Sequence, residues 1–215
     1  MKTNPLRTPP RWWAAASGGT GLIANAFLVL FYLTAQPWTG NAGDGWFGAA
    51  NDVLVLIQYL ALVPVVLGLG RLMDGDTRAR VWTGIGLVAA VAVIVLQALL
   101  ITGAMPFERQ VVAVSLSAVL TMCWAGAISA AGTRTRTLPR TVTRLGRVVV
   151  IGLPIALGTF GIGALVTAVS GVSWAWAAGG IPGFVVWTLF PAWTLLLATA
   201  PSRPRDRPTA DPGRR

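Results

Sequence analysis

The chain has 215 residues, of which 54% are hydrophobic and only 11% are charged, whereas roughly a quarter of the residues of a soluble domain are charged. This composition excludes an ordinary soluble domain and predicts a membrane protein. Lys and Arg number 17 against 7 Asp and Glu. Because the basic residues occur in short segments between apolar runs, without interleaved aromatic residues, they favour contact with anionic lipid headgroups and argue against nucleic acid as a partner.

Cysteine and histidine are almost absent from the chain. Cys123 is the single cysteine and there is no histidine. This inventory excludes an intrachain disulfide, zinc sites built from Cys and His, and acid–base chemistry by imidazole. We therefore predict no cofactor and no metal site.

Six apolar segments of roughly 20 residues or more follow one another along the chain. The first, from about Trp13 to Ala35, comes after the basic start MKTNPLRTPPR and is too long for the apolar region of a signal peptide. The other five extend approximately over residues 47–72, 81–105, 107–131, 145–172 and 180–200. Backbone groups in hydrocarbon must find partners within their own segment, so runs this long predict helices. The predicted fold is all-α, a bundle of six transmembrane helices.

The basic residues predict how the chain is oriented. Sixteen of the 17 flank the spans on one side, and only Arg109 lies on the other. Because cytoplasmic loops carry the excess of Lys and Arg, both termini are predicted to be cytoplasmic, in a multi-pass protein of the bacterial inner membrane. Residues 1–12 form a basic N-terminal segment and residues 13–200 the transmembrane domain. The tail 201–215, PSRPRDRPTADPGRR, has too little apolar surface to fold and is predicted to be disordered.

Asp52 follows Asn51 near the expected outer end of the second span. A carboxylate there can cap exposed backbone N–H groups and suits the helix dipole, which is the interpretation we favour. The second interpretation is a functional carboxylate that lines an outer vestibule. Arg109, beside Glu108 at the start of the fourth span, is expected to form an ion pair with Asp52, Asp44 or Glu108.

Two glutamines lie deeper in the spans. Gln58 is six residues, about 9 Å, inward from Asp52, and Gln97 lies a similar distance inward from the expected outer end of the third span. Since lipid offers neither amide a partner, we expect them to bond each other or to face one pocket. The alternatives are interhelical hydrogen bonding and a small outward-facing ligand site. The candidate ligand-binding residues are Gln58, Gln97, Trp187, Thr188, Ser115 and Asp52; no catalytic residue is predicted.

Glycines are dense in the first and fifth spans, with Gly18, Gly19 and Gly21 in the one and Gly158 and Gly161 among those in the other. Small residues let helix backbones approach closely, so these glycines predict helix packing, within the chain or in a homo-oligomer.

Four segments carry a resemblance to known proteins: GTGLIANAFLVLFYLTA, NDVLVLIQYLALVPVVLGLGRL, IVLQALLITGAMPFE and FVVWTLFPAWTLLLA. Their order and spacing resemble uncharacterised six-helix bacterial integral membrane proteins that are classed as a domain of unknown function. The resemblance implies a shared fold and no particular activity.

Three classes of function are compatible with these features. The first is a non-enzymatic component that binds or transports a small lipophilic or neutral solute at the polar layer of Gln58, Gln97 and Trp187. The second is a non-catalytic subunit or regulator of a membrane complex. The third, a membrane enzyme acting on a lipid or isoprenoid, has little support, because Asp52 and Glu108 are the only acidic groups near the expected depth.

Overall fold

The computed structural model describes residues 11–35, 45–172 and 174–200, and within these ranges the only regular elements are six α-helices. They are α1 (Arg11–Ala35), α2 (Trp46–Leu72), α3 (Thr77–Ile101), α4 (Phe107–Arg134), α5 (Arg140–Ser170) and α6 (Ala175–Thr199). The prediction of an all-α bundle of six helices is confirmed. The predictions for residues 1–10 and for the tail 201–215 fall outside the described residues.

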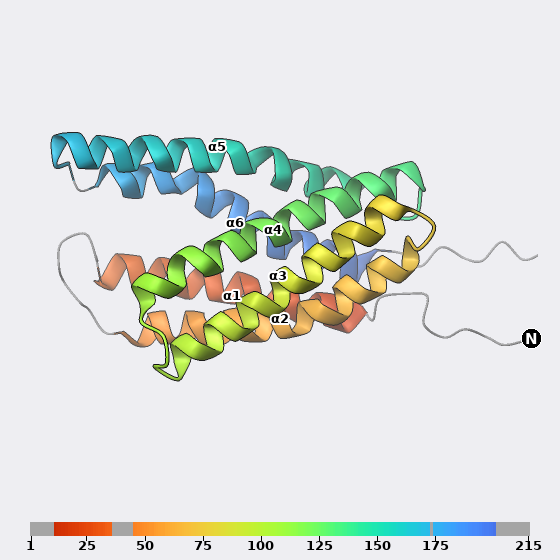
Figure 1. Ribbon diagram of the computed structural model, residues 1–215, viewed down its shortest axis with the longest axis horizontal. Coiled ribbons are helices and arrows are strands. Elements are labelled where there is room, and N and C mark those ends of the chain that lie inside the picture. The colour runs from red at the N-terminus through yellow and green to blue at the C-terminus, as the bar shows by residue number, and fades with distance from the viewer. Residues whose placement is uncertain (1–10, 36–44, 173, 201–215) are drawn as a thin grey trace, which may run out of the picture.

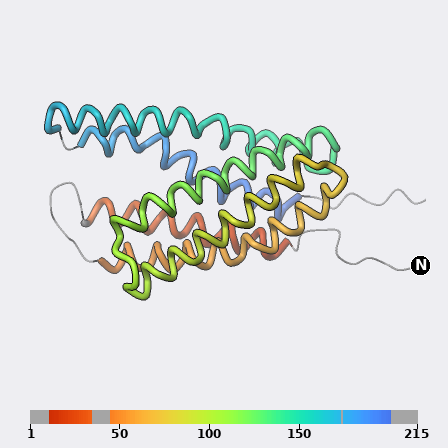
Figure 2. The backbone as a smooth tube through the Cα atoms, viewed as in Figure 1, coloured from red at the N-terminus to blue at the C-terminus, as the bar shows by residue number. Residues whose placement is uncertain are grey.

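Successive helices run in opposite directions (Figure 1). Each packs against its neighbours in the chain, and α1 also packs against α6, so the six helices close a ring. The start of α1 and the end of α6 lie at the same end of the bundle, as the backbone tube shows (Figure 2). There the Arg11 guanidinium donates to the carbonyl oxygen of Ala200 at 2.5 Å.

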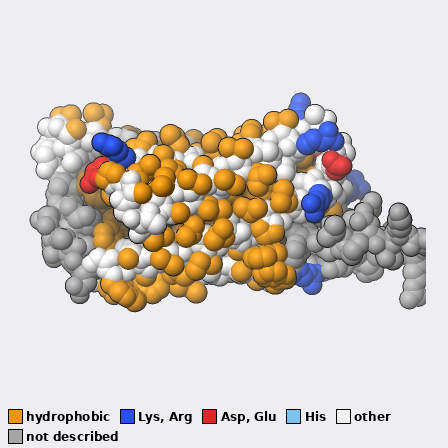
Figure 3. Space-filling model, turned by 60° about the horizontal axis from the view of Figure 1, so that its bottom comes forward, with side chains coloured by type: hydrophobic (Ala, Val, Ile, Leu, Met, Phe, Trp, Pro, Cys, Tyr) orange, Lys and Arg blue, Asp and Glu red, His pale blue; other side chains and the backbone are white. Residues whose placement is uncertain are grey.

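All six helices are long and apolar enough to cross a bilayer. At 1.5 Å per residue even the 25-residue helices extend over about 37 Å, more than the roughly 30 Å of a hydrocarbon core. Large apolar side chains point outward, with Val88 exposed by 71% and Val169 by 81%. Apolar side chains cover the length of the visible face, while most of the basic ones gather at one end and a smaller basic patch lies at the other (Figure 3). The chain is a multi-pass membrane protein.

The basic end of the bundle is held by short-range polar contacts. Asp76 caps α3, where its Oδ1 accepts from the backbone N–H groups of Arg78 at 2.9 Å and Ala79 at 3.1 Å. Its Oδ2 accepts from the Arg134 guanidinium at 2.7 Å, which links the α2–α3 turn to the end of α4. The hydrogen bond from Arg134, followed by the backbone N–H of Ala79, lowers the pKa of the Asp76 carboxyl.

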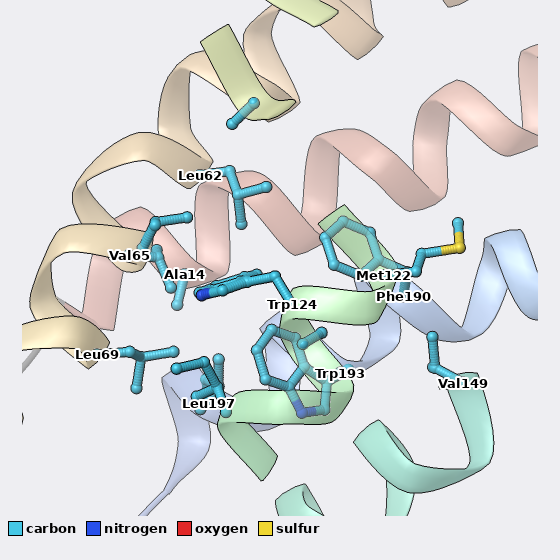
Figure 4. Packing of buried hydrophobic residues seen from close by; sticks show 14 of the residues in the cluster. Ala14, Leu62, Val65, Leu69, Met122, Trp124, Val149, Phe190, Trp193 and Leu197 are labelled. Atoms are coloured by element: carbon cyan, nitrogen blue, oxygen red, sulfur yellow. The ribbon is translucent and has the colours of Figure 1, made fainter. Parts of the chain in front are cut away.

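An aromatic cluster fills the bundle in the half nearer the basic end (Figure 4). The rings of Trp124 and Trp193, both fully buried, meet edge to face with centroids 5.6 Å apart, and Phe190 stacks on Trp193 at 6.1 Å. Glycine makes room for them, because a Cβ at Gly86 would lie 2.5 Å from Cγ of Trp124. The other half of the bundle, away from the basic end, contains the polar residues described next.

Candidate functional site

Asp52 lies inside α2 and does not cap it. The helix begins at Trp46, its N-cap residue is Gly45, and no side chain caps that end. Asp52 is six residues further on, about 9 Å along the axis. The favoured prediction of a helix cap is therefore wrong, because the residues before Asn51 continue the helix outward. Counted from the central residue of α2, Tyr59, Asp52 lies about 10 Å from the middle of the helix. With that middle placed at the bilayer midplane, Asp52 falls within the roughly 15 Å half-thickness of hydrocarbon.

A chain of hydrogen bonds connects Asp52 to α3 and α4. Gln110 Nε2 donates to Gln97 Oε1 at 2.5 Å, and Gln97 Nε2 donates to Asp52 Oδ1 at 3.5 Å. Asn51 Nδ2 donates to the same carboxylate oxygen at 3.4 Å. Both glutamines are buried, and Asp52 is half-buried. Each amide thus directs its N–H toward the carboxylate along the chain of hydrogen bonds.

The antiparallel turn between α3 and α4 brings the two glutamines together. Gln97 lies four residues before the end of α3 at Ile101, and Gln110 lies three residues after the start of α4 at Phe107. They therefore lie at one level. Sequence reasoning missed Gln110, although it is followed at helical spacing by Ser117 and Thr121 on the same inward face, a pattern that could have revealed it.

The carboxylate retains unused bonding capacity. An ionised carboxylate has about four acceptor positions, and the two contacts of Asp52 are long. Within the described residues no basic side chain forms an ion pair with it. Arg109 is exposed and forms no ion pair with Asp52 or Glu108 in that part of the chain, so the predicted pairing with either residue is wrong; Asp44 lies outside the described residues.

Gln58 lies elsewhere in the bundle. It is next to the central residue of α2, whereas Gln97 is about 12 Å from the centre of α3. The expected common depth was wrong because it was measured from Asp52, as though the span ended there. Gln58 also faces a different way: at 100° per residue, six residues turn its side chain about 120° from that of Asp52.

The surroundings of Gln58 are a packing contact between helices. A Cβ at Gly21 of α1 would lie 2.7 Å from both Cδ and Nε2 of Gln58 and 2.7 Å from Cβ of Pro191 in α6. No hydrogen bond joins Gln58 to Gln97 in the described part of the chain, so the expectation that the amides bond each other is wrong.

The remaining predicted site residues are also separate from Asp52. Thr188 Oγ1 accepts from Asn25 Nδ2 at 3.2 Å, which joins α6 to α1. Trp187 is partly buried against the hydrophobic core, and Ser115 is exposed on α4. The structure therefore brings Asp52 and Gln97 together, adds Gln110, and places the other four predicted residues elsewhere.

No protein-family model, curated protein or solved structure matches the chain. Within the described residues no group of three or more His, Cys, Asp or Glu side chains is placed to hold a metal ion. The function must therefore be argued from the Asp52, Gln97 and Gln110 side chains, which we call the polar triad.

Proposed function

We propose that the protein is a non-enzymatic membrane component that binds or transports a small molecule, and that the polar triad is its binding site. The observation that carries this proposal is the Asp52 carboxylate, which is half-buried at membrane depth and has no basic partner among the described residues. Ionisable groups inside a membrane are costly, and they are usually retained for function.

The chemistry of the triad favours a solute that carries a positive charge. When ionised, the carboxylate offers a negative charge and free acceptor positions. Gln97 of α3 donates to it, and Gln110 of α4 donates in turn to Gln97. A solute at this depth also meets the hydrocarbon of the bilayer, which suits a lipophilic body attached to the cationic group. We therefore expect small lipophilic amines to bind better than neutral molecules of the same shape.

Ligand-induced thermal stabilisation of the purified protein in detergent micelles tests this proposal. A series of alkylammonium ions and the neutral alcohols of equal chain length are the probes. We expect the ammonium compounds to raise the Tm of the wild type, and Asp52→Asn to abolish that rise.

The matched control is Glu108→Gln, which removes an exposed acidic charge at the same end of the bundle. This variant should respond to the ammonium compounds as the wild type does. If both variants lose the rise in Tm equally, the ammonium compounds respond to the overall surface charge and not to the site. An unchanged rise in Asp52→Asn would refute the assignment of the site.

We also propose that both termini face the cytoplasm and that the protein resides in the bacterial inner membrane. The support is the excess of basic side chains at the end of the bundle where α1 begins and α6 ends (Figure 3). Reporter fusions at residue 138 and at the C-terminus should both give a cytoplasmic signal. A periplasmic signal at either position would reverse the orientation.

The alternative function is a non-catalytic subunit or regulator. It is favoured by one face of α5, where Gly158 and Gly161 are exposed and a Cβ at either would meet no atom within 4 Å. Another helix could approach this face closely. Phe substitutions at both glycines should then release a co-purifying subunit and leave binding of ammonium ions unchanged.

A further inference from the structure

A cavity of about 210 Å³ opens between the end of α2 and the start of α3, at the opposite end of the bundle from the polar triad. Its lining combines apolar, small and charged residues: Leu67, Gly70, Arg71, Asp74, Arg80 and Thr83.

One wall of the cavity is fixed by close helix packing. A Cβ at Gly70 would lie 2.9 Å from Thr83 Oγ1, so α2 and α3 approach each other here with no space for a side chain. The Thr83 hydroxyl donates to the carbonyl oxygen of Ala79 at 2.7 Å, which holds its side chain in place. The cavity is thus a property of the packed hairpin.

The two arginines of the lining differ in their partners. Arg80 forms an ion pair with Asp74 at 3.3 Å and also donates to the Asp74 carbonyl oxygen at 2.9 Å. Arg71 is exposed, and in the described part of the chain it forms no ion pair. Its guanidinium, which has five N–H donors and a permanent charge, is therefore available to an anion.

The residues that line the cavity lie at two levels of the bilayer, which correspond to the acyl chains and the phosphate of a lipid. Counted from Tyr59 at the centre of α2, Leu67 lies about 12 Å away and Arg71 about 18 Å away. The hydrocarbon core ends at about 15 Å and the headgroup layer at about 20 Å. Leu67 therefore lies at the level of acyl chains and Arg71 at the level of lipid phosphates.

We propose that this cavity binds one anionic phospholipid. Its phosphate contacts Arg71, with the Arg80–Asp74 pair beside it, and the first part of an acyl chain lies over Leu67. Basic pockets between transmembrane helices are suited to such headgroups. This site is separate from the polar triad, so neither proposal depends on the other.

Native mass spectrometry of the full chain, titrated with phosphatidylglycerol or phosphatidylcholine in detergent micelles, tests the proposal. We expect retention of one phosphatidylglycerol in preference to phosphatidylcholine. Arg71→Gln should weaken the binding of phosphatidylglycerol about fivefold, the effect of one basic residue near the surface. Arg78→Gln is the control, because Arg78 is exposed in the first turn of α3, at the same end of the bundle, and does not line the cavity.

Two results would overturn the assignment. If Arg78→Gln weakens binding as much as Arg71→Gln, the lipid responds to overall charge and not to the cavity. If inorganic phosphate raises the Tm of the wild type as much as phosphatidylglycerol does, the apolar part of the cavity contributes nothing. A Tm of Arg71→Gln equal to that of Arg78→Gln without lipid shows that both variants are folded, so that a difference in binding supports the proposal.

Discussion

Two polar residues of α2, Asp52 and Gln58, lie in different surroundings in the bundle. Asp52 faces α3 and α4 and takes part in a chain of hydrogen bonds with Gln97 and Gln110. Gln58, also buried, packs against Gly21 of α1, close to where Pro191 of α6 also meets Gly21. The region around Asp52 is held together by hydrogen bonds, and the region around Gln58 by close packing between helices. The number of residues along a helix determines depth, but the angle around its axis determines which neighbours a side chain meets.

The region around Gln58 should respond most strongly to added volume. A Cβ at Gly18 would lie 2.7 Å from the carbonyl oxygen of Pro191 and 2.8 Å from the backbone nitrogen of Leu195, so Gly18→Ala must push α1 away from α6. We expect this variant to lose about 3 kcal/mol, the upper end of typical overpacking. Unfolding of the purified protein in micelles measures the loss.

Gly19→Ala is the matched control, since a Cβ there would meet no atom within 4 Å. Its stability should equal or slightly exceed that of the wild type, because alanine favours helix more than glycine does. Equal losses in Gly18→Ala and Gly19→Ala would show that close contact between α1 and α6 does not determine the stability of this region.

The triad should respond to the loss of hydrogen bonds. Gln97→Leu leaves the buried Gln110 amide without its acceptor and removes a donor from Asp52, which should cost about 1–3 kcal/mol of unfolding free energy. Gln58→Leu breaks no hydrogen bond within the described residues and replaces a buried polar group by an apolar one, so it should cost less than about 1 kcal/mol. A larger loss in Gln58→Leu than in Gln97→Leu would contradict the division of α2 into a polar and a packing side.

The smallest effect is expected at Asp76, which differs from Asp52 in having a basic partner. Because Arg134 and backbone N–H groups lower its pKa, the ionised carboxylate stabilises the fold above the ordinary pKa of about 3.9. That stabilisation is lost as the pH falls through the lower folded pKa. We expect Asp76→Asn to have a slightly lower Tm than the wild type at pH 6 and a nearly equal Tm at pH 2.5. A gap that stays constant between these two pH values would exclude this charge effect.

The sequence alone was sufficient to predict the six spans, but it was not sufficient to predict which residues form the site. Hydropathy located all six helices, yet α5 begins at Arg140 and α6 at Ala175, each five residues before the predicted start. Hydropathy detects the lipid-exposed part of a helix, whereas helical structure continues into the headgroup layer. Gln97 was correctly singled out as a buried polar group, but its partner Gln110 was not. To find the hydrogen-bond partner of a buried side chain, one must know which helices face each other. The packing between helices determines that arrangement.

The most direct test of the central claim is a pair of double-mutant cycles that use Leu substitutions and unfolding free energies in micelles. Gln97 and Gln110 share a hydrogen bond, so their cycle should give a coupling energy of about 1 kcal/mol. Gln58 and Gln97 share no hydrogen bond in the described part of the chain, so their effects should add within about 0.5 kcal/mol. A strong coupling between Gln58 and Gln97, together with additivity of Gln97 and Gln110, would contradict the polar triad.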